Sequence, residues 1–251
     1  MQTGSSAVRE ASFWDEHVPS LDECLAVHAA GPDRSSLAVL EHLEPLDGAR
    51  VLDFACGAGV LSAWLADRGA DVVGLDISAG SIARARELVA ALGLSVTFVA
   101  SPISPTAPEG SFDRICGSFA LHHTDLAVTG PLLASKLVPG GTAAFIETMA
   151  TNPLLRFARR FVGRFGVPRY GSLDEHPLTS RDLEFLGRTF GEVSSFAPEL
   201  VFMRIFDRQL LGFRHRRVSR AIAALDDSLG RLGLDALSYQ QVVVLRSRSG
   251  S

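Results

Sequence analysis

The segment Val51-Leu52-Asp53-Phe54-Ala55-Cys56-Gly57-Ala58-Gly59 decides the fold of this chain. Its first four residues are largely apolar and predict a short buried strand. The two glycines predict a turn, because a backbone without Cβ atoms tolerates positive φ and lets a ligand approach closely. The apolar spacing that begins at Val60 then predicts a helix. A strand, a glycine turn and a helix N-terminus in this order predict a nucleotide-binding corner, where N–H groups of the first helical turn bond the ligand.

Further strands and helices are predicted to alternate along the chain, and this alternation indicates an α/β fold with a mostly parallel sheet. Apolar runs and turn residues predict strands over 71–76, 94–100, 113–118, 142–147, 192–202 and 239–245. Amphipathic spacing and capping residues predict helices over 33–46, 60–68, 78–92, 125–137, 154–165, 179–190 and 204–231, and residues 1–12 are predicted to fray.

The second predicted strand ends in Asp76, which stands 23 residues after Asp53. A carboxylate at that strand tip can accept hydrogen bonds from both hydroxyls of a ribose. The alternative is that Asp76 caps the helix that begins near Ser78. Its place after the glycine turn favours ribose binding.

Three stretches together resemble the class I S-adenosylmethionine-dependent methyltransferases. The glycine turn is similar to motif I of that family, with Ala55 in the first glycine position; 111–123 is similar to its fourth-strand motif, and 137–141 to its Leu-x-Pro-Gly-Gly turn. The resemblance implies a Rossmann-like methyltransferase fold, with a mostly parallel seven-stranded sheet, an antiparallel terminal strand, a helical N-terminal lid and helical cap insertions. It divides the chain into a lead-in or lid (1–47), an S-adenosylmethionine-binding core (48–150) and cap helices with C-terminal strands (151–251).

The resemblance also assigns the cofactor-binding residues. The turn from Ala55 to Gly59 is expected to hold the methionyl part of S-adenosylmethionine, and Asp53 to steady this turn or reach the amino group. Ser101 stands where the family often has an acidic residue that bonds the adenine amine, so a hydroxyl or backbone group would replace that contact. The full predicted set is Asp53, Ala55, Cys56, Gly57, Gly59, Asp76, Ile77, Ser101, Pro102, Ile103 and Phe119.

Candidate catalytic residues follow the fourth and fifth strands. His122 and His123 come just after the fourth strand, and histidine has a pKa suited to removing a proton at neutral pH. Glu147 ends the fifth strand at the edge where open α/β sheets bind ligands. The alternatives are that both histidines pack and bond backbone groups and that Glu147 is a solvated loop carboxylate. His176 is a weaker candidate, and a nucleophilic role of Cys56 is disfavoured because no base is placed beside it.

The composition limits the possible cellular location and binding partners of the protein. The net charge of −4 argues against a general nucleic-acid binder. The three cysteines lack the spacing of a metal site, so no metal is expected. No apolar run is long enough for a transmembrane helix and no secretory signal is visible, which favours a cytoplasmic protein. The oligomeric state is left open.

The predicted function is S-adenosylmethionine-dependent methyl transfer to a small, apolar or aromatic metabolite of the natural-product type. Arginines interleaved with phenylalanines over 156–169, and more arginines over 204–220, fit either a solvated helix face or a site for an anionic acceptor or an acidic membrane surface. Alternatives are a methyltransferase fold used for a reaction such as cyclisation, and methylation of an anionic lipid or isoprenoid. An NAD-dependent oxidoreductase is less favoured, since Ser62 replaces the third glycine of its fingerprint.

Overall fold

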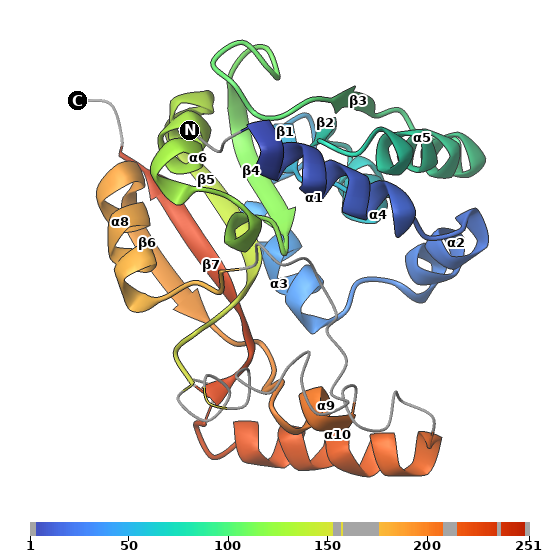
Figure 1. Cartoon of the computed structure of the whole chain (residues 1–251), viewed down its shortest axis with the longest axis vertical. Helices are drawn as coiled ribbons and strands as arrows, with labels where there is room; N and C mark the ends of the chain where they lie inside the picture. Colours follow the sequence, from blue (N-terminus) through green and yellow to red (C-terminus); the bar gives the residue numbers. More distant parts are fainter. Residues whose placement is uncertain (1–3, 153–156, 158–175, 208–214, 235–236, 249–251) are drawn as a thin grey trace.

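The computed structural model describes residues 4–152, 157, 176–207, 215–234 and 237–248, which form a seven-stranded sheet flanked by helices (Figure 1). The strand order is β3-β2-β1-β4-β5-β7-β6. Strands β1 to β5 are parallel to their neighbours, whereas β7 is antiparallel to both β5 and β6. The predicted α/β class, with an antiparallel terminal strand, is therefore confirmed. The strands are β1 (Arg50–Phe54), β2 (Asp71–Asp76), β3 (Thr97–Ala100), β4 (Phe112–Ser118), β5 (Leu137–Thr148), β6 (Gly191–Phe196) and β7 (Gln240–Ser247).

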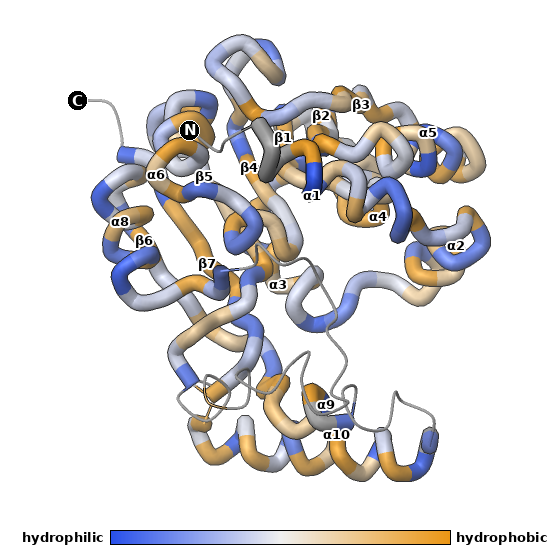
Figure 2. The backbone as a smooth tube through the Cα atoms, viewed as in Figure 1, coloured by the Kyte–Doolittle hydropathy of each residue, from blue (hydrophilic) through white to orange (hydrophobic). Residues whose placement is uncertain are grey.

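Helices cover both faces of this sheet, so its central strands are apolar on both sides. Successive residues of β1 show this, since Val51 packs in one apolar cluster and Leu52 in another. Figure 2 shows the resulting concentration of hydrophobic residues on the strands. The helices are α1 (Gly4–Glu16), α2 (Leu21–Ala30), α3 (Arg34–Leu43), α4 (Val60–Ala66), α5 (Ala79–Leu92), the 3-10 turn η1 (Leu121–His123), α6 (Leu126–Lys136), α8 (Ser180–Phe190), α9 (Met203–Phe206) and α10 (Arg216–Gly230).

Most helices begin at the capping residues that the sequence offers. Asp33 accepts a hydrogen bond from the Ser36 N–H at the start of α3, and Thr179 forms a capping box with Asp182 at the start of α8. Among the described helices, none is both long and apolar enough to cross a membrane.

Several predicted boundaries were wrong. Helix α1 begins at Gly4 although residues 1–12 were predicted to fray, and β3 begins at Thr97, three residues after its predicted start. The helix predicted over 204–231 is not continuous, because α9 ends at Phe206 and α10 begins at Arg216. The predicted helix over 154–165 lies almost wholly outside the described residues.

Two non-glycine residues, Ala55 and Phe119, have positive φ values of 55° and 56°. They follow the neighbouring strands β1 and β4, at the sheet edge where ligands of open α/β sheets bind. A left-handed backbone is unfavourable for residues with a Cβ atom, and such strain is concentrated at functional sites. Ala55 thus occupies the glycine position of the motif in the backbone conformation that glycine prefers.

We predict that Ala55→Gly raises the free energy of unfolding by about 1 kcal/mol, because glycine relieves the Cβ clash of the left-handed region. The melting temperature should rise by about 2–4 °C. Ala58→Gly is the matched control, since Ala58 lies in the same turn without positive φ and its replacement should destabilise. Equal destabilisation by both variants would show that Ala55 carries no strain.

Candidate functional site

The candidate site lies at the carboxyl ends of β1, β2, β4 and β5, which meet at one edge of the sheet. The turn after β1 is tied to the tip of β2 by a hydrogen bond of 2.9 Å from the Gly57 N–H to Asp76 Oδ2. Gly57 has a φ of 51°, and a Cβ atom added there would meet no atom within 4 Å. The space on this side of Gly57 is therefore open.

Asp76 is nearly buried, with 9% of its surface exposed, and its Oδ1 accepts a hydrogen bond of 2.8 Å from the Ser78 N–H. The residue that caps α5 is Ser78 itself, so the alternative of Asp76 as the helix cap is wrong. Burial raises the pKa of Asp76, and the hydrogen bonds from Ser78 and Gly57 oppose this shift. A carboxylate offers about four acceptor positions, and the N–H groups of Ser78, Gly57 and Ile77 use part of them, so this side chain can still accept from a ribose hydroxyl.

Asp53 lies beneath the turn rather than at its surface, with 1% of its surface exposed. Its Oδ2 accepts a hydrogen bond of 2.6 Å from Ser62 Oγ, and the Cys116 thiol lies 3.8 Å from Oδ1. Burial raises the pKa of Asp53 to about 7, while the hydrogen bonds from Ser62 and Cys116 act in the opposite direction. These contacts join β1 to α4 and β4, and the role of Asp53 in the glycine turn stays a prediction.

The residues predicted to hold adenine follow β3 and β4. The Ser101 N–H donates to the Asp76 carbonyl at 2.9 Å, and Ser101 Oγ donates to the Pro102 carbonyl at 3.0 Å. Ile103 packs against the core, and Ile77 is half-buried after β2. Phe119 keeps 41% of its surface exposed, which is unusual for a phenylalanine placed among strand ends. These positions agree with an adenine site, and the individual roles stay predictions.

Glu147 is fully buried at the end of β5, so the alternative of a solvated loop carboxylate is wrong. Its Oε1 accepts hydrogen bonds from the N–H groups of Ala120 and Leu121, at 3.0 and 2.7 Å. Its Oε2 accepts from the His122 N–H at 3.3 Å and lies 2.7 Å from His122 Nδ1. An ionised carboxylate can only accept a hydrogen bond, so the ring tautomer that matches this contact carries its proton on Nδ1.

A second group of side chains reaches this edge from α1. Glu10 Oε1 lies 2.9 Å from His123 Nδ1 and accepts a hydrogen bond of 2.9 Å from Trp14 Nε1. The Trp14 and His123 rings meet edge-on, with centroids 5.7 Å apart. The next residue of α1, Asp15, accepts hydrogen bonds at Oδ1 from Ser78 Oγ and the Gly80 N–H, at 2.6 and 2.9 Å. Helix α1 therefore bridges the ribose side and the histidine side of the site.

The sequence reasoning gave this segment as either a lid or a helix packed on the sheet edge, and it did not single out Glu10, Trp14 or Asp15. No motif marks them, because their contacts with the sheet edge, such as those of Asp15 with Ser78 and Gly80, join residues 63 or more positions apart. His176 touches the site through its backbone, since its N–H donates to the His122 carbonyl at 2.8 Å.

The cysteines support no nucleophilic or metal-binding role. Burial raises the pKa values of the Cys56 and Cys116 thiols well above the ordinary value, so both stay protonated and unreactive. Within the part of the chain that the structure describes, no group of three His, Cys, Asp or Glu side chains is arranged to hold a metal ion.

Comparison with known proteins agrees with this geometry. Residues 51–141 match a family model described as "Methyltransferase domain". The matched stretch holds the glycine turn, and the chain has the fold that the resemblance implied, so the resemblance to S-adenosylmethionine-dependent methyltransferases is supported over these residues.

Among curated proteins, a ubiquinone biosynthesis O-methyltransferase of Bordetella avium (strain 197N) is 34% identical over 146 residues, which are 57% of this chain and 58% of that protein. One of Sinorhizobium medicae (strain WSM419) is 33% identical over 159 residues, 58% of this chain and 64% of that protein. The chain thus spans somewhat more than half the length of these relatives.

A magnesium protoporphyrin IX methyltransferase of Synechocystis PCC 6803, solved with bound SAH, superposes with a TM-score of 0.56 at 15% identity, over 85% of this chain and 84% of that one. The (4+2)-cyclase SpnF superposes with a TM-score of 0.57 at 19% identity, over 86% and 81% of the two chains. At such low identity these neighbours establish the fold only.

We predict that Asp53 makes stability depend on pH. Its pKa of about 7 in the folded protein exceeds the 3.8 of an ordinary aspartate, so the folded state favours the protonated form. The contribution of protonated Asp53 to the free energy of unfolding is fully present below about pH 4. This contribution falls by up to about 4 kcal/mol as the pH rises to about 7. Asp53→Asn, which keeps an acceptor for Ser62, should remove this dependence.

The measurement is urea unfolding of both proteins between pH 5 and 8. The difference in unfolding free energy, natural protein minus Asp53→Asn, should decrease steadily with pH. A difference that stays constant would mean that Asp53 is ionised throughout the range.

Proposed function

We propose that the protein transfers the methyl group of S-adenosylmethionine to a hydroxyl group of a small, apolar or aromatic metabolite. The observation that carries the proposal is the pairing of two arrangements at one sheet edge. One is the open glycine turn bonded to Asp76, and the other is the buried Glu147–His122 pair. The O-methyltransferase names of the curated relatives support it independently.

The residues present fit the cofactor. The open space beside Gly57 suits the methionyl part, and the remaining acceptor positions of Asp76 suit the ribose hydroxyls. The exposed ring of Phe119 offers an apolar surface for adenine or for the methyl group. When bound, S-adenosylmethionine supplies an electrophilic methyl group, so the protein has to align the acceptor in line with it and exclude water.

The pair formed by Glu147 and His122 favours a hydroxyl acceptor, because such an acceptor must lose a proton. Glu147 holds the Nδ1 proton and orients the ring, which leaves His122 Nε2 to accept the proton of the hydroxyl. The Phe119 ring meets the His122 ring edge-on, with centroids 6.3 Å apart, and gives the acceptor an apolar neighbour. Glu147 acts here as a positioning residue.

Two other functions remain as competitors. The fold likeness to the cyclase SpnF keeps a non-methylating reaction as the second candidate. An NAD-dependent oxidoreductase is disfavoured, since Ser62 at the third glycine position is buried and donates to Asp53. Incubation of the protein with methyl-labelled donor and a panel of phenols and other hydroxylated metabolites distinguishes these functions. Formation of labelled product together with S-adenosylhomocysteine supports methyl transfer. Conversion of an acceptor without S-adenosylhomocysteine would support the cyclase alternative.

We predict that Asp76→Ala weakens binding of S-adenosylhomocysteine more than tenfold, a loss of about 1.4 kcal/mol or more. The change removes the ribose acceptor and the partner of the Gly57 N–H. Asp71→Ala is the control, because Asp71 begins the same strand and is exposed. Fluorescence titration measures the dissociation constants, and an unchanged constant for Asp76→Ala would remove this residue from the ribose site.

We also predict that His122→Gln lowers kcat about 10²–10⁴-fold, as expected for loss of a general base. The dissociation constant of S-adenosylhomocysteine and the KM of the acceptor should stay within about twofold, since neither reports proton removal. His42→Gln, on α3, is the control. If His122→Gln only lowers the melting temperature while kcat is preserved, the histidine is a packing residue and the base assignment is wrong.

A further inference from the structure

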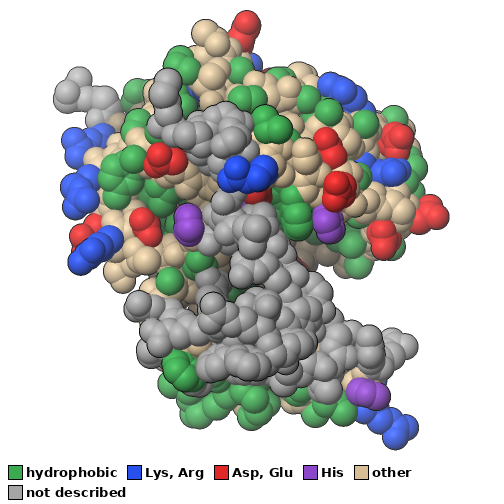
Figure 3. Space-filling view, in the orientation of Figure 1, with side chains coloured by type: hydrophobic (Ala, Val, Ile, Leu, Met, Phe, Trp, Pro, Cys, Tyr) green, Lys and Arg blue, Asp and Glu red, His purple; other side chains and the backbone are tan. Residues whose placement is uncertain are grey.

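Helix α10 exposes an apolar stripe that the proposed methyl transfer does not use. Val218 and Leu225 are 43% and 45% exposed, and Leu232, just beyond the helix, is 74% exposed. Val218 and Leu225 are seven positions apart and therefore lie along one line of the helix, and Leu232 follows in the turn after it. Figure 3 shows the hydrophobic side chains along the lower rim of the molecule, where α10 lies in Figure 1.

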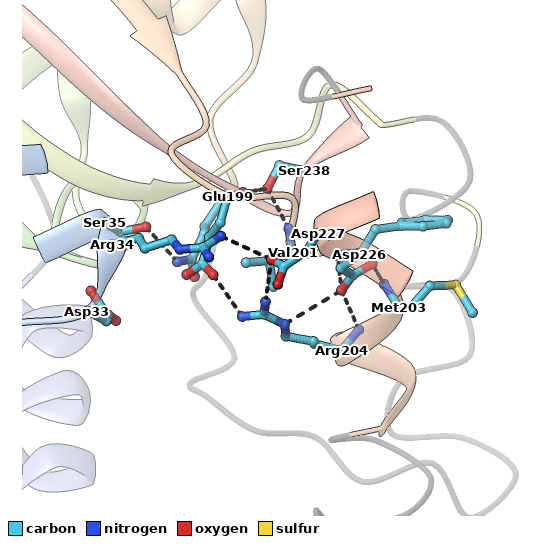
Figure 4. Close-up of polar contacts among 12 residues, drawn as sticks. Asp33, Arg34, Ser35, Glu199, Val201, Met203, Arg204, Asp226, Asp227 and Ser238 are labelled. Atoms are coloured by element: carbon cyan, nitrogen blue, oxygen red, sulfur yellow. Dashed lines mark hydrogen bonds and ion pairs between the residues drawn. The ribbon is translucent and has the colours of Figure 1, made fainter. Parts of the chain in front are cut away.

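Both acidic residues of α10 bond groups of other segments, as Figure 4 shows. Asp226 is fully buried and accepts hydrogen bonds from the N–H groups of Phe202, Met203 and Arg204, at 3.3, 2.8 and 3.0 Å. Asp227 accepts from Arg204 Nη2 at 3.3 Å and from Arg34 Nη1 of α3 at 3.0 Å. The carboxylates are thus used to attach α10 to α9 and to the core.

The outer face is basic as a consequence. Arg217, Arg220 and Arg231 are exposed, and the apolar stripe has exposed Ala221 and Ala224 beside it. An amphipathic helix with an apolar stripe and a basic flank is suited to lying in the interface of a membrane. The whole chain has a net charge of −4, so this positive face is a local feature and not a reflection of composition.

We propose that the outer face of α10 binds an anionic lipid surface. Val218, Leu225 and Leu232 enter the boundary between headgroups and acyl chains, and the three arginines meet lipid phosphates. A second copy of the chain is disfavoured as the partner of this face, because pairing two α10 faces would bring their arginines together. The inference is independent of methyl transfer, since no residue of the sheet edge takes part.

The test is flotation of the full chain with vesicles of phosphatidylcholine, alone or with about one third phosphatidylglycerol. Binding is expected only to the anionic vesicles and should be lost as NaCl rises from about 0.1 to about 0.5 M. Replacing Arg217, Arg220 and Arg231 by Gln should lower the partition coefficient about 100-fold, and the double variant Leu225→Glu, Leu232→Glu should abolish binding.

Val27→Glu is the matched control, because Val27 is 50% exposed on α2, outside the proposed surface, and its replacement should leave binding unchanged. Circular dichroism checks that each variant folds. If the leucine variant does not fold, the arginine variant alone tests the proposal. Absence of binding, equal binding to neutral vesicles, or a dimer by light scattering that the leucine variant disrupts would each overturn the proposal.

Discussion

The hydrogen bond between the Gly57 N–H and the Asp76 carboxylate is the interaction on which the site depends. It joins the turn after β1 to the tip of β2, so the two parts that would hold the methionyl and ribose groups form one unit. The left-handed conformations of Ala55 and Gly57 are needed to present that N–H, and Asp53 supports the same turn from below through Ser62. Bonds within the protein thus fix the turn, and a fixed turn reduces the conformational cost of binding.

The same device recurs in three places. A buried carboxylate accepts several backbone N–H groups and thereby fixes the start of a segment: Asp76 for the turn and α5, Glu147 for η1, and Asp226 for α9. Each replaces the water that those N–H groups would lose on burial. At Glu147 the arrangement also orients the His122 ring, so a structural contact and a chemical role coincide.

The strands and the glycine turn could be predicted because their information is local. Apolar runs, glycines and capping residues determine structure through neighbours in sequence. This local information was sufficient to predict the strands of the core and to place Asp76 at the end of β2. The role of α1 could not be predicted, because Glu10 and Trp14 contact His123 only after the fold has brought them together. The hydrogen bonds that fix the start of α9 were missed for the same reason, because Asp226 lies 22 to 24 residues further along the chain. The roles proposed for the site residues stay predictions.

Titration calorimetry of the purified chain tests the central claim most directly. S-adenosylmethionine and S-adenosylhomocysteine should each bind at one site per chain, and NAD should give no heat under the same conditions. If neither adenosyl ligand bound, or if NAD bound in their place, the strand-tip carboxylate and glycine turn would serve another ligand and the methyltransferase account would be contradicted.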